Sequence, residues 1–499
     1  MSDKKIIIIG AGIAGLSAGC YAQMNGYKAL LFEMHDKPGG LCTSWNRDGY
    51  TIDGCVHWLV GSQLGTAFYQ LWEELGAAQD REFFYADEYY RYEAKDGRTF
   101  ILYADIDCLE QHMLELSPED KNVIHEFCKA ARGFVKLDMP VGKPRELMNV
   151  LDYLKMSDAI LKYLPLMQWN RRTMIEVIKK FKSPLIRDAI LNAWPGTFPA
   201  GFLLTTIAYL HKKAAGYPIG GSLEFARAIE KRYLNLGGNL KYNTRVVKIL
   251  VENNKAIGIR LNDGTEIRAD YVISAADMHT TIFDMLDGKY IDDTIQGYFK
   301  RLTPYPAVIF IGLGINREFN DIPAMVSSMR IELPQPVKIA DRDRTTFGFH
   351  VFNHDPTLAP PGKTSAISAM ASSIEWWQNL YQDKNKYKAA KQEVVGKLIG
   401  LLNQRFPGIA AQIEMCDVAT PVTFLRYTGN WQASIQGWSA TPKTWMTQFQ
   451  KKLPGLENFW MCGQWLDSIG GLPPAALSGR NAIQFTCHQD KKKFLSFVP

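Results

Sequence analysis

The pattern of apolar and polar positions near the start of the chain predicts a strand, a helix and a second strand. Two lysines precede four consecutive isoleucines, at residues 6–9, and a second short apolar run covers residues 28–32. Short β-branched runs of this kind, without alternation, are typical of strands buried on both faces of a parallel sheet. The stretch between the two runs has the length of a helix, so residues 4–33 predict a βαβ unit.

The rest of the chain predicts a mixture of helices and strands. Segments with helical character are 64–78, 107–132 and 386–405, and those with strand character are 82–105, 307–315, 365–372 and 458–463. Residues 217–277 predict a turn, a helix and a meander of strands, with turns at Asn253-Asn254 and Asp263-Gly264. This alternation indicates an α/β protein with more than one sheet.

Three glycines in the first unit carry the strongest chemical signal. Gly10, Gly12 and Gly15 form G-x-G-x-x-G directly after the first strand. In this setting the first glycine permits a tight turn, the second lets the backbone approach a pyrophosphate, and the third lets the helix pack on the strand. Glu33 ends the second strand eighteen residues after Gly15, where a carboxylate can bind an adenosine ribose. We therefore predict a dinucleotide site, with a purely structural βαβ unit as the alternative.

The residues after this unit resemble a family of flavoproteins. Gly39-Gly40 follows Glu33 by six residues, and the next segment contains an aromatic residue and D-G-x-x-I-D, which ends at Asp53. This arrangement resembles the two-dinucleotide-binding flavoproteins, and within them the branch of phytoene desaturases, carotenoid isomerases and retinol saturases. Phytoene desaturases proper and monoamine oxidases usually have Arg after the glycine pair. Leu41 takes that place here, which favours the isomerase and saturase branch.

Two later segments extend the resemblance. Residues 216–277 contain P-x-G-G, V-x-x-I starting at Val246, and A-D-Y-V-I-S; residues 419–487 contain T-P-x-T and a final strand that ends at Gly463. In the family a Gly-Asp pair grips the ribityl chain. Gln464 replaces that Asp and Asp467 lies three residues later, so either could make the contact. The helix after this loop would direct its positive end at the flavin ring.

The resemblance implies FAD as the cofactor and a discontinuous fold. The resemblance implies two domains. The first is a Rossmann-type, amine oxidase-like FAD-binding domain of residues 1–75, 216–285 and 415–499. The second is a mixed α+β substrate domain of residues 76–215 and 286–414. The expected cofactor-binding residues are Gly10, Gly12, Ile13, Ala14, Gly15, Glu33, Met34, Gly40, Leu41, Val246, Gly463, Gln464, Asp467, Gly471, Leu472 and Pro473. Asp53 and His57 are the candidate catalytic groups, with a packing role for His57 as the alternative. We expect no metal site.

Composition narrows the class of protein without changing this interpretation. With 46% hydrophobic and 22% charged residues, the chain is typical of globular proteins. The net charge of +6 does not require a nucleic-acid partner. Eight scattered cysteines without a CxxC pair favour reduced thiols and a cytosolic location. The uncharged stretches 6–27 and 189–210 are interrupted by glycine or proline, so neither predicts a membrane span.

Residues 151–187 hold most of the net positive charge. They contain eight basic and three acidic residues, and Met174, Ile178 and Phe181 fall on one helical face. A basic amphipathic segment of this kind predicts reversible docking on the inner face of a membrane. An ordinary solvated helix is the alternative.

Three functions are consistent with these features. The first is FAD-dependent desaturation, saturation or cis-trans isomerisation of a polyene or isoprenoid lipid, by hydride exchange with flavin N5. The second is a flavin amine oxidase, against which Leu41 argues. The third is a non-catalytic lipid-binding module of the GDP-dissociation-inhibitor type, against which the intact glycines and Glu33 argue. Fold alone does not choose between them.

Overall fold

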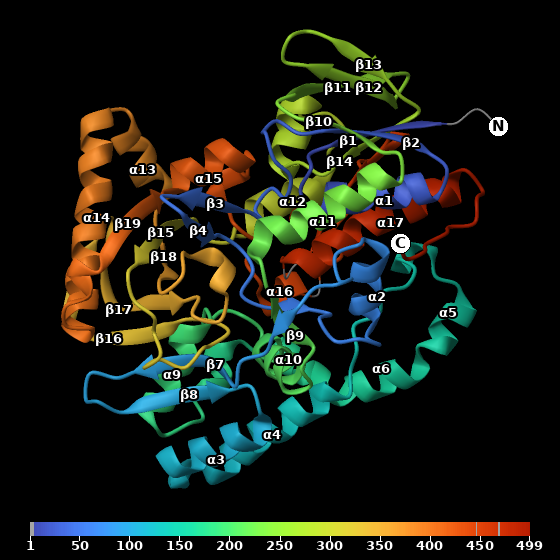
Figure 1. The fold of residues 1–499 in the computed structure, drawn as a ribbon. Coiled ribbons are helices and arrows are strands. Elements are labelled where there is room, and N and C mark those ends of the chain that lie inside the picture. The colour runs from blue at the N-terminus through green and yellow to red at the C-terminus, as the bar shows by residue number, and fades with distance from the viewer. Residues whose placement is uncertain (1–3, 446, 468–469) are drawn as a thin grey trace.

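The fold is built around two large β-sheets. The computed structural model describes residues 4–445, 447–467 and 470–499, and Figure 1 shows its fold. One sheet has five strands and the other seven, and smaller two- and three-stranded sheets lie beside them.

The five-stranded sheet gathers strands from distant parts of the chain. Its order is β10-β2-β1-β14-β20 and every pair is parallel. The strands are β1 (Lys5–Ile9), β2 (Lys28–Phe32), β10 (Asn239–Lys241), β14 (Tyr271–Ser274) and β20 (Phe459–Met461). Along β1, Ile6 and Ile8 belong to one core cluster, and Ile7 and Ile9 to another. Burial on both faces explains the uninterrupted apolar run.

Helices pack closely on one face of this sheet. α1 (Ile13–Met24), α11 (Gly221–Asn235) and α17 (Leu472–Gln489) share the core cluster of Ile6 and Ile8. A Cβ on Gly479 would lie 2.2 Å from the Ala14 carbonyl oxygen, so α17 approaches α1 at a distance that only glycine permits. Figure 1 shows the two helices side by side beneath the strands. The other face is covered by the antiparallel meander β11 (Val246–Glu252), β12 (Lys255–Leu261) and β13 (Glu266–Arg268), with α12 (Asp293–Arg301).

The seven-stranded sheet has the order β19-β15-β18-β17-β16-β7-β8. Its strands are β7 (Glu88–Glu93), β8 (Thr99–Tyr103), β15 (Val308–Ile315), β16 (Met329–Ile339), β17 (Arg342–Val351), β18 (Thr364–Ala371) and β19 (Ile413–Ala419). α13 (Ile374–Tyr381) and α14 (Lys384–Arg405) cover it with Trp377, Val394 and Leu398. The strands expected over 307–315 and 365–372 and the helix expected over 386–405 are thus confirmed.

A helical region lies below the five-stranded sheet in Figure 1, and its α9 (Pro184–Ala193) is beside β7 and β8. It also contains α3 (Ile106–Leu116), α4 (Lys121–Val135), α5 (Val150–Lys155), α6 (Ser157–Tyr163), α7 (Met167–Arg171), α8 (Met174–Ile178) and α10 (Ala200–His211). The helical character expected over 107–132, with a cap and first turn at Ser117–Asp120, is confirmed: a 3-10 turn after Ser117 separates α3 from α4. The Asp120 carboxylate in that turn accepts hydrogen bonds from the backbone N–H groups of Lys182 and Ser183, which ties α4 to the start of α9.

The expectation for the apolar face of residues 151–187 is wrong. Met174, Ile178 and Phe181 are exposed by 1% or less and belong to the core of the helical region. The spacing of apolar residues identified a buried face correctly, but the chain packs that face against its own helices. Lys179, Lys180 and Lys182 stay exposed, and Lys180 pairs with Glu126 of α4 at 3.6 Å.

Short elements complete the fold. β3 (Ser44–Arg47) and β4 (Tyr50–Asp53) form a hairpin, and β5 (Leu59–Val60), β9 (Ala215–Pro218) and β6 (Phe83–Phe84) form a small sheet. The remaining helices are α2 (Ala67–Glu74), α15 (Pro421–Thr428) and α16 (Pro442–Trp445). The expected division into two discontinuous domains stays a prediction. Within the described ranges, none of the helices combines the length and the apolar character needed to cross a bilayer.

Candidate functional site

One large cavity runs between the parallel sheet and the helical region. Its volume is about 1980 Å³. Ligand pockets usually measure about 300–1,000 Å³, so this space can hold a dinucleotide together with a second molecule. Of the expected cofactor-binding residues, all except Gly15 line it, and so does His57. Asp53 does not belong to its lining.

The N-terminus of α1 opens into this cavity. Gly12 is its N-cap and no side chain caps the helix, so the first N–H groups remain available to an anion. A Cβ on Gly12 would meet only the Gly39 carbonyl oxygen, at 3.9 Å, whereas a Cβ on Gly15 would lie 1.9 Å from the Gly10 carbonyl oxygen. Gly12 therefore leaves space above the helix end, and Gly15 packs the helix against the turn.

Glu33 lies at the far end of the same site. Its Oε2 accepts a hydrogen bond from the Ala11 N–H at 2.8 Å and its Oε1 one from the His35 N–H at 3.0 Å. Each oxygen keeps a lone pair that can accept from a ribose hydroxyl. The Thr244 N–H donates to the Glu33 carbonyl oxygen, which brings Val246 at the start of β11 to this end. Met34 lines the wall next to Gly429. A Cβ atom built on Gly429 would be 3.9 Å from the Met34 methyl carbon.

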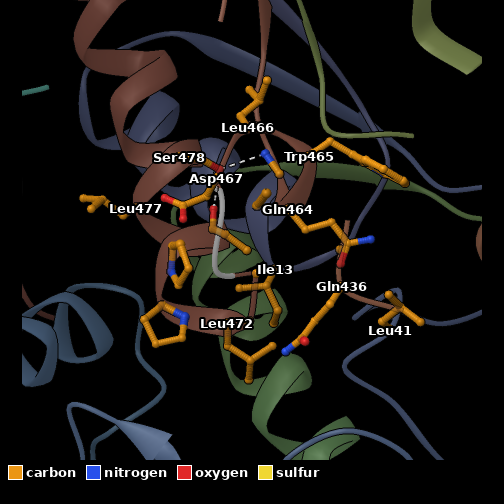
Figure 2. A pocket seen from close by; sticks show the side chains of 18 of the residues that line it. Ile13, Leu41, Gln436, Gln464, Trp465, Leu466, Asp467, Leu472, Leu477 and Ser478 are labelled. Carbon is orange, nitrogen blue, oxygen red and sulfur yellow. Dashed lines mark hydrogen bonds between the residues drawn. The ribbon is translucent and has the colours of Figure 1, made fainter. Parts of the chain in front are cut away.

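A second uncapped helix N-terminus, that of α17, lies at the other end. Gly471 is its N-cap, no side chain of the described residues caps it, and Leu472 and Pro473 follow in the cavity wall. Figure 2 shows Ile13, Gln464 and Leu472 gathered at this end, with Leu41 towards the edge of the view. Gln464 and Asp467 both line the cavity, so the choice between them as ribityl contact stays open.

These features fit FAD. Two helix N-termini without side-chain caps suit the negatively charged pyrophosphate and the electron-rich edge of a reduced flavin. A buried carboxylate with free lone pairs suits the ribose. The individual contacts remain predictions.

His57 is held in an apolar part of the cavity wall. Its ring packs edge-on against His350, with ring centroids 5.0 Å apart. Its Nδ1 is buried without a hydrogen-bond partner among the described residues. Burial lowers the pKa of His57 to about 4 because the charged imidazolium is poorly solvated there. The imidazole is therefore neutral at physiological pH.

Asp53 lies at the end of β4 and binds the start of α11. Its carboxylate accepts hydrogen bonds from the Ser222 hydroxyl, the Ser222 N–H at 3.1 Å, the Tyr217 hydroxyl at 3.1 Å and the Cys55 N–H at 3.3 Å. Burial raises its pKa to about 6, although these hydrogen bonds act in the opposite direction. All four hydrogen-bond donors belong to the protein itself. This geometry therefore favours a structural role for Asp53 over a catalytic one.

Aromatic side chains line the part of the cavity that lies beyond the cofactor end. Trp58 and Trp194 meet edge-to-face with centroids 5.8 Å apart, Tyr89 stacks on Trp194 at 6.4 Å, and Phe202 meets Trp194 at 4.8 Å. Flat apolar walls of this kind suit a flat apolar ligand. The sequence contained these residues, but no local motif indicated that segments so far apart share one wall.

Two further polar residues of the wall lay outside the sequence prediction. Asp277 follows β14 and accepts hydrogen bonds from the N–H groups of Thr280 at 2.8 Å and Trp431 at 2.9 Å. Burial raises its pKa above the ordinary value. Gln436 lies against the Gly470 turn, where a Cβ on Gly470 would be 2.7 Å from the Gln436 carbonyl oxygen. In the sequence, Asp277 ends the A-A-D that directly follows A-D-Y-V-I-S, and this position was the signal that could have identified it.

Comparison with known proteins gives related enzymes. A prolycopene isomerase of Daucus carota is 23% identical, with 88% of this chain and 72% of that protein covered. A neurosporene-forming phytoene desaturase of Rhodobacter capsulatus is 26% identical over 84% of this chain and 82% of that protein. An inactive all-trans-retinol 13,14-reductase of Danio rerio is 23% identical over 84% of this chain and 74% of that protein.

Solved structures share the fold. Cyclohexylamine oxidase of Brevibacterium oxydans has a TM-score of 0.60 at 14% identity, and the match covers 98% of this chain and 100% of that one. Residues 13–484 match the family model of flavin-containing amine oxidoreductases. Since that match spans almost the whole chain and the cavity fits FAD, the protein belongs to the flavin-containing amine oxidoreductase family and is an FAD-dependent oxidoreductase.

Proposed function

We propose that this enzyme changes carbon–carbon bonds of a polyene or isoprenoid lipid by desaturation, saturation or cis-trans isomerisation. The observation that carries the proposal is the continuous cavity, which extends from the cofactor end to the aromatic wall of Trp58, Tyr89 and Trp194. A conjugated chain is long, flat and apolar, and the aromatic side chains of this wall suit such a ligand. The printed names of the relatives, a prolycopene isomerase and a phytoene desaturase, support the same substrate class.

The chain would bind and orient the lipid and exclude water around the reacting carbons. Bound FAD would supply a hydride acceptor or donor. Glu33, the α1 N-terminus and the α17 N-terminus would hold the cofactor at its ribose, pyrophosphate and ring. We propose that His57, a neutral imidazole in the wall, accepts or returns the proton that accompanies hydride exchange.

Incubation of the holoenzyme with phytoene, prolycopene or retinol tests the proposal. With oxidised or reduced FAD we expect loss or gain of two hydrogens in the lipid, or a new isomer of unchanged mass, resolved by chromatography and mass spectrometry. His57→Ala should lower turnover about 100-fold or more with normal FAD content. An enzyme that leaves every polyene unchanged but releases hydrogen peroxide with simple amines would be an amine oxidase instead.

A membrane surface is the natural source of so insoluble a substrate, and α5 and α6 are suited to reach it. These two helices contain no buried residue. Of the sixteen exposed large apolar side chains in the described ranges, seven lie within residues 150–164: Val150, Leu151, Tyr153, Leu154, Ile160, Leu161 and Leu164, exposed by 39–75%. Exposed apolar surface concentrated in this way marks an interaction site.

The same two helices border the cavity. Tyr153, Met156 and Ile160 line it, and Figure 1 shows α5 and α6 along the outer edge of the molecule. We propose that this edge enters the lipid headgroup region and that the substrate passes beside it. Burial of one such side chain contributes about 1.5–3 kcal/mol, so four of them give roughly 6 kcal/mol or more, which suits reversible attachment.

Liposome flotation tests this docking separately from catalysis. The triple variant Leu151→Ser, Leu154→Ser, Leu161→Ser should lose flotation and keep its FAD spectrum. A matched triple of exposed apolar residues elsewhere, Leu234→Ser, Val247→Ser and Tyr381→Ser, should float as wild type does. Changing Lys179, Lys180 and Lys182 to Glu should reduce flotation only with anionic lipid. Equal flotation of both serine triples would exclude α5 and α6 as the docking edge.

A further inference from the structure

Two cysteines lie together in the wall of the cofactor cavity. Cys42 follows Gly40 by two residues, Cys55 follows Asp53 by two, and both line the cavity. They flank the β3–β4 hairpin, whose register pairs Ser44 with Asp53. The Gly54 N–H donates to the Thr43 carbonyl oxygen at 3.1 Å, so the pairing continues one step beyond the strands.

This register places Cys42 opposite Cys55. The two cysteines lie just beyond the strand ends; if the ladder is continued past the Thr43–Gly54 hydrogen bond, they form a pair without one, for which the usual Cα spacing is about 4.5 Å. Disulfides form across Cα distances of about 4.4–6.8 Å. The neighbouring Cys55 thiol, together with burial, raises the pKa of Cys42 well above its ordinary value. The backbone is therefore already close to the geometry of a disulfide.

Hydrogen bonds to Ser222 hold the Cys42 thiol and the backbone next to Cys55. The Cys42 thiol donates to the Ser222 carbonyl oxygen, with Sγ and oxygen 3.3 Å apart, and the Val56 N–H donates to the Ser222 hydroxyl oxygen at 2.8 Å. Cys42 is 1% exposed, whereas Cys55 is partly exposed and faces the cavity. Cys55 is thus the more accessible of the two residues to a cavity occupant, and Cys42 would act as the resolving thiol.

We propose that Cys42 and Cys55 are a redox-active dithiol that exchanges one electron pair with the flavin. In the oxidising direction two S–H bonds break and one S–S bond forms. The two electrons and one proton pass to the oxidised flavin, and the second proton passes to water. The reverse step re-forms both thiols from a reduced flavin. The enzyme then holds two electron pairs where the flavin alone holds one.

Burial determines which reaction partners the pair accepts. The thiolate is the reactive form, and the raised pKa of Cys42 keeps that thiol protonated at neutral pH. External oxidants and alkylating reagents therefore react slowly with Cys42, while a partner held beside the pair reacts at high effective concentration. The proposal requires bound FAD but not the polyene substrate, so it goes beyond the proposed function.

An anaerobic reductive titration of the air-oxidised holoenzyme tests it. Wild type should take up four electrons per flavin, and Cys42→Ser and Cys55→Ser should each take up two. The exposed cysteines provide the matched control, and Cys108→Ser and Cys416→Ser should keep the wild-type value of four.

Peptide mapping gives a readout that does not depend on activity. Arg47 is the only tryptic cleavage site between the two cysteines. In the air-oxidised wild type the two peptides should stay joined, with a mass two hydrogens below the sum of the thiols, and dithionite with bound FAD should separate them. If a serine variant fails to fold, these wild-type measurements still test whether the two cysteines form a disulfide. An uptake of two electrons by wild type, or free thiols at both positions after air oxidation, would overturn the proposal.

Discussion

Replacing Gly12 with alanine yields a folded protein that has lost most of its FAD. In the chain itself the new methyl group meets only the Gly39 carbonyl oxygen, at 3.9 Å, and the φ of −67° at Gly12 suits alanine. The methyl group instead enters the space above the α1 N-terminus, where a pyrophosphate must approach the backbone. We expect FAD binding to weaken by about 2 kcal/mol or more, roughly 30-fold.

The measurement is the FAD-to-protein ratio after gel filtration, with the dissociation constant from flavin fluorescence and the fold from circular dichroism. Gly396→Ala is the matched control, because its Cβ would meet nothing within 4 Å and it lies in α14, away from the cavity. Gly15→Ala should differ from both, since its Cβ would overlap the Gly10 carbonyl oxygen and destabilise the whole unit. Wild-type affinity in Gly12→Ala would contradict the placement of the pyrophosphate.

Replacing Asp53 with alanine destabilises the protein strongly. The change leaves four donors without their acceptor, from Ser222, Tyr217 and Cys55. A buried donor left unpaired costs about 1–3 kcal/mol, so we expect a loss of about 4 kcal/mol or more in the free energy of unfolding. Asp293→Ala, at an exposed position in the first turn of α12, should change it by less than about 0.5 kcal/mol.

The effect of Asp53→Ala has a defined pH dependence. The folded-state pKa of about 6 lies above the ordinary value of 3.8, so the contribution of this carboxyl group is complete below pH 3.8 and declines as the pH rises through 6. The difference in melting temperature between wild type and Asp53→Ala should therefore narrow from pH 5 to pH 8. A normal melting temperature combined with lost turnover would instead restore Asp53 as a catalytic candidate.

The sequence allowed the cofactor end of the site to be predicted because its determinants are local. Gly10, Gly12, Gly15 and Glu33 lie within one βαβ unit, and strand and helix propensity place them without help from the rest of the chain. The same holds for Val246, which begins a strand of a recognisable meander.

Other features depend on partners that lie far away in the sequence. Asp53 binds Ser222, which is 169 residues later, and nothing near Asp53 indicates a structural role. The pairing of Cys42 with Cys55 follows from the register of the β3–β4 hairpin. A scan for closely spaced cysteines could not detect it.

The exposed and buried faces of residues 151–187 show the same limit of prediction from sequence. An amphipathic pattern identifies which side chains avoid water, but not whether protein or lipid receives them. Met174 and Phe181 pack against other helices of the chain, whereas Leu151 and Leu161 in the same region remain exposed. Only the tertiary structure separates these two cases.

The strand order of the parallel sheet has a consequence for biosynthesis. β1 is made before the other strands of this sheet and lies between β2 and β14, and β14 pairs in turn with β20 at residues 459–461. During translation the growing chain therefore holds an incomplete sheet until β20 has left the ribosome. Contacts so distant in sequence form slowly, and the apolar edge of β14 stays unpaired in the meantime. The ring end of the cavity needs α17, which follows β20, so the nascent chain cannot complete its cofactor site before α17 has been synthesised.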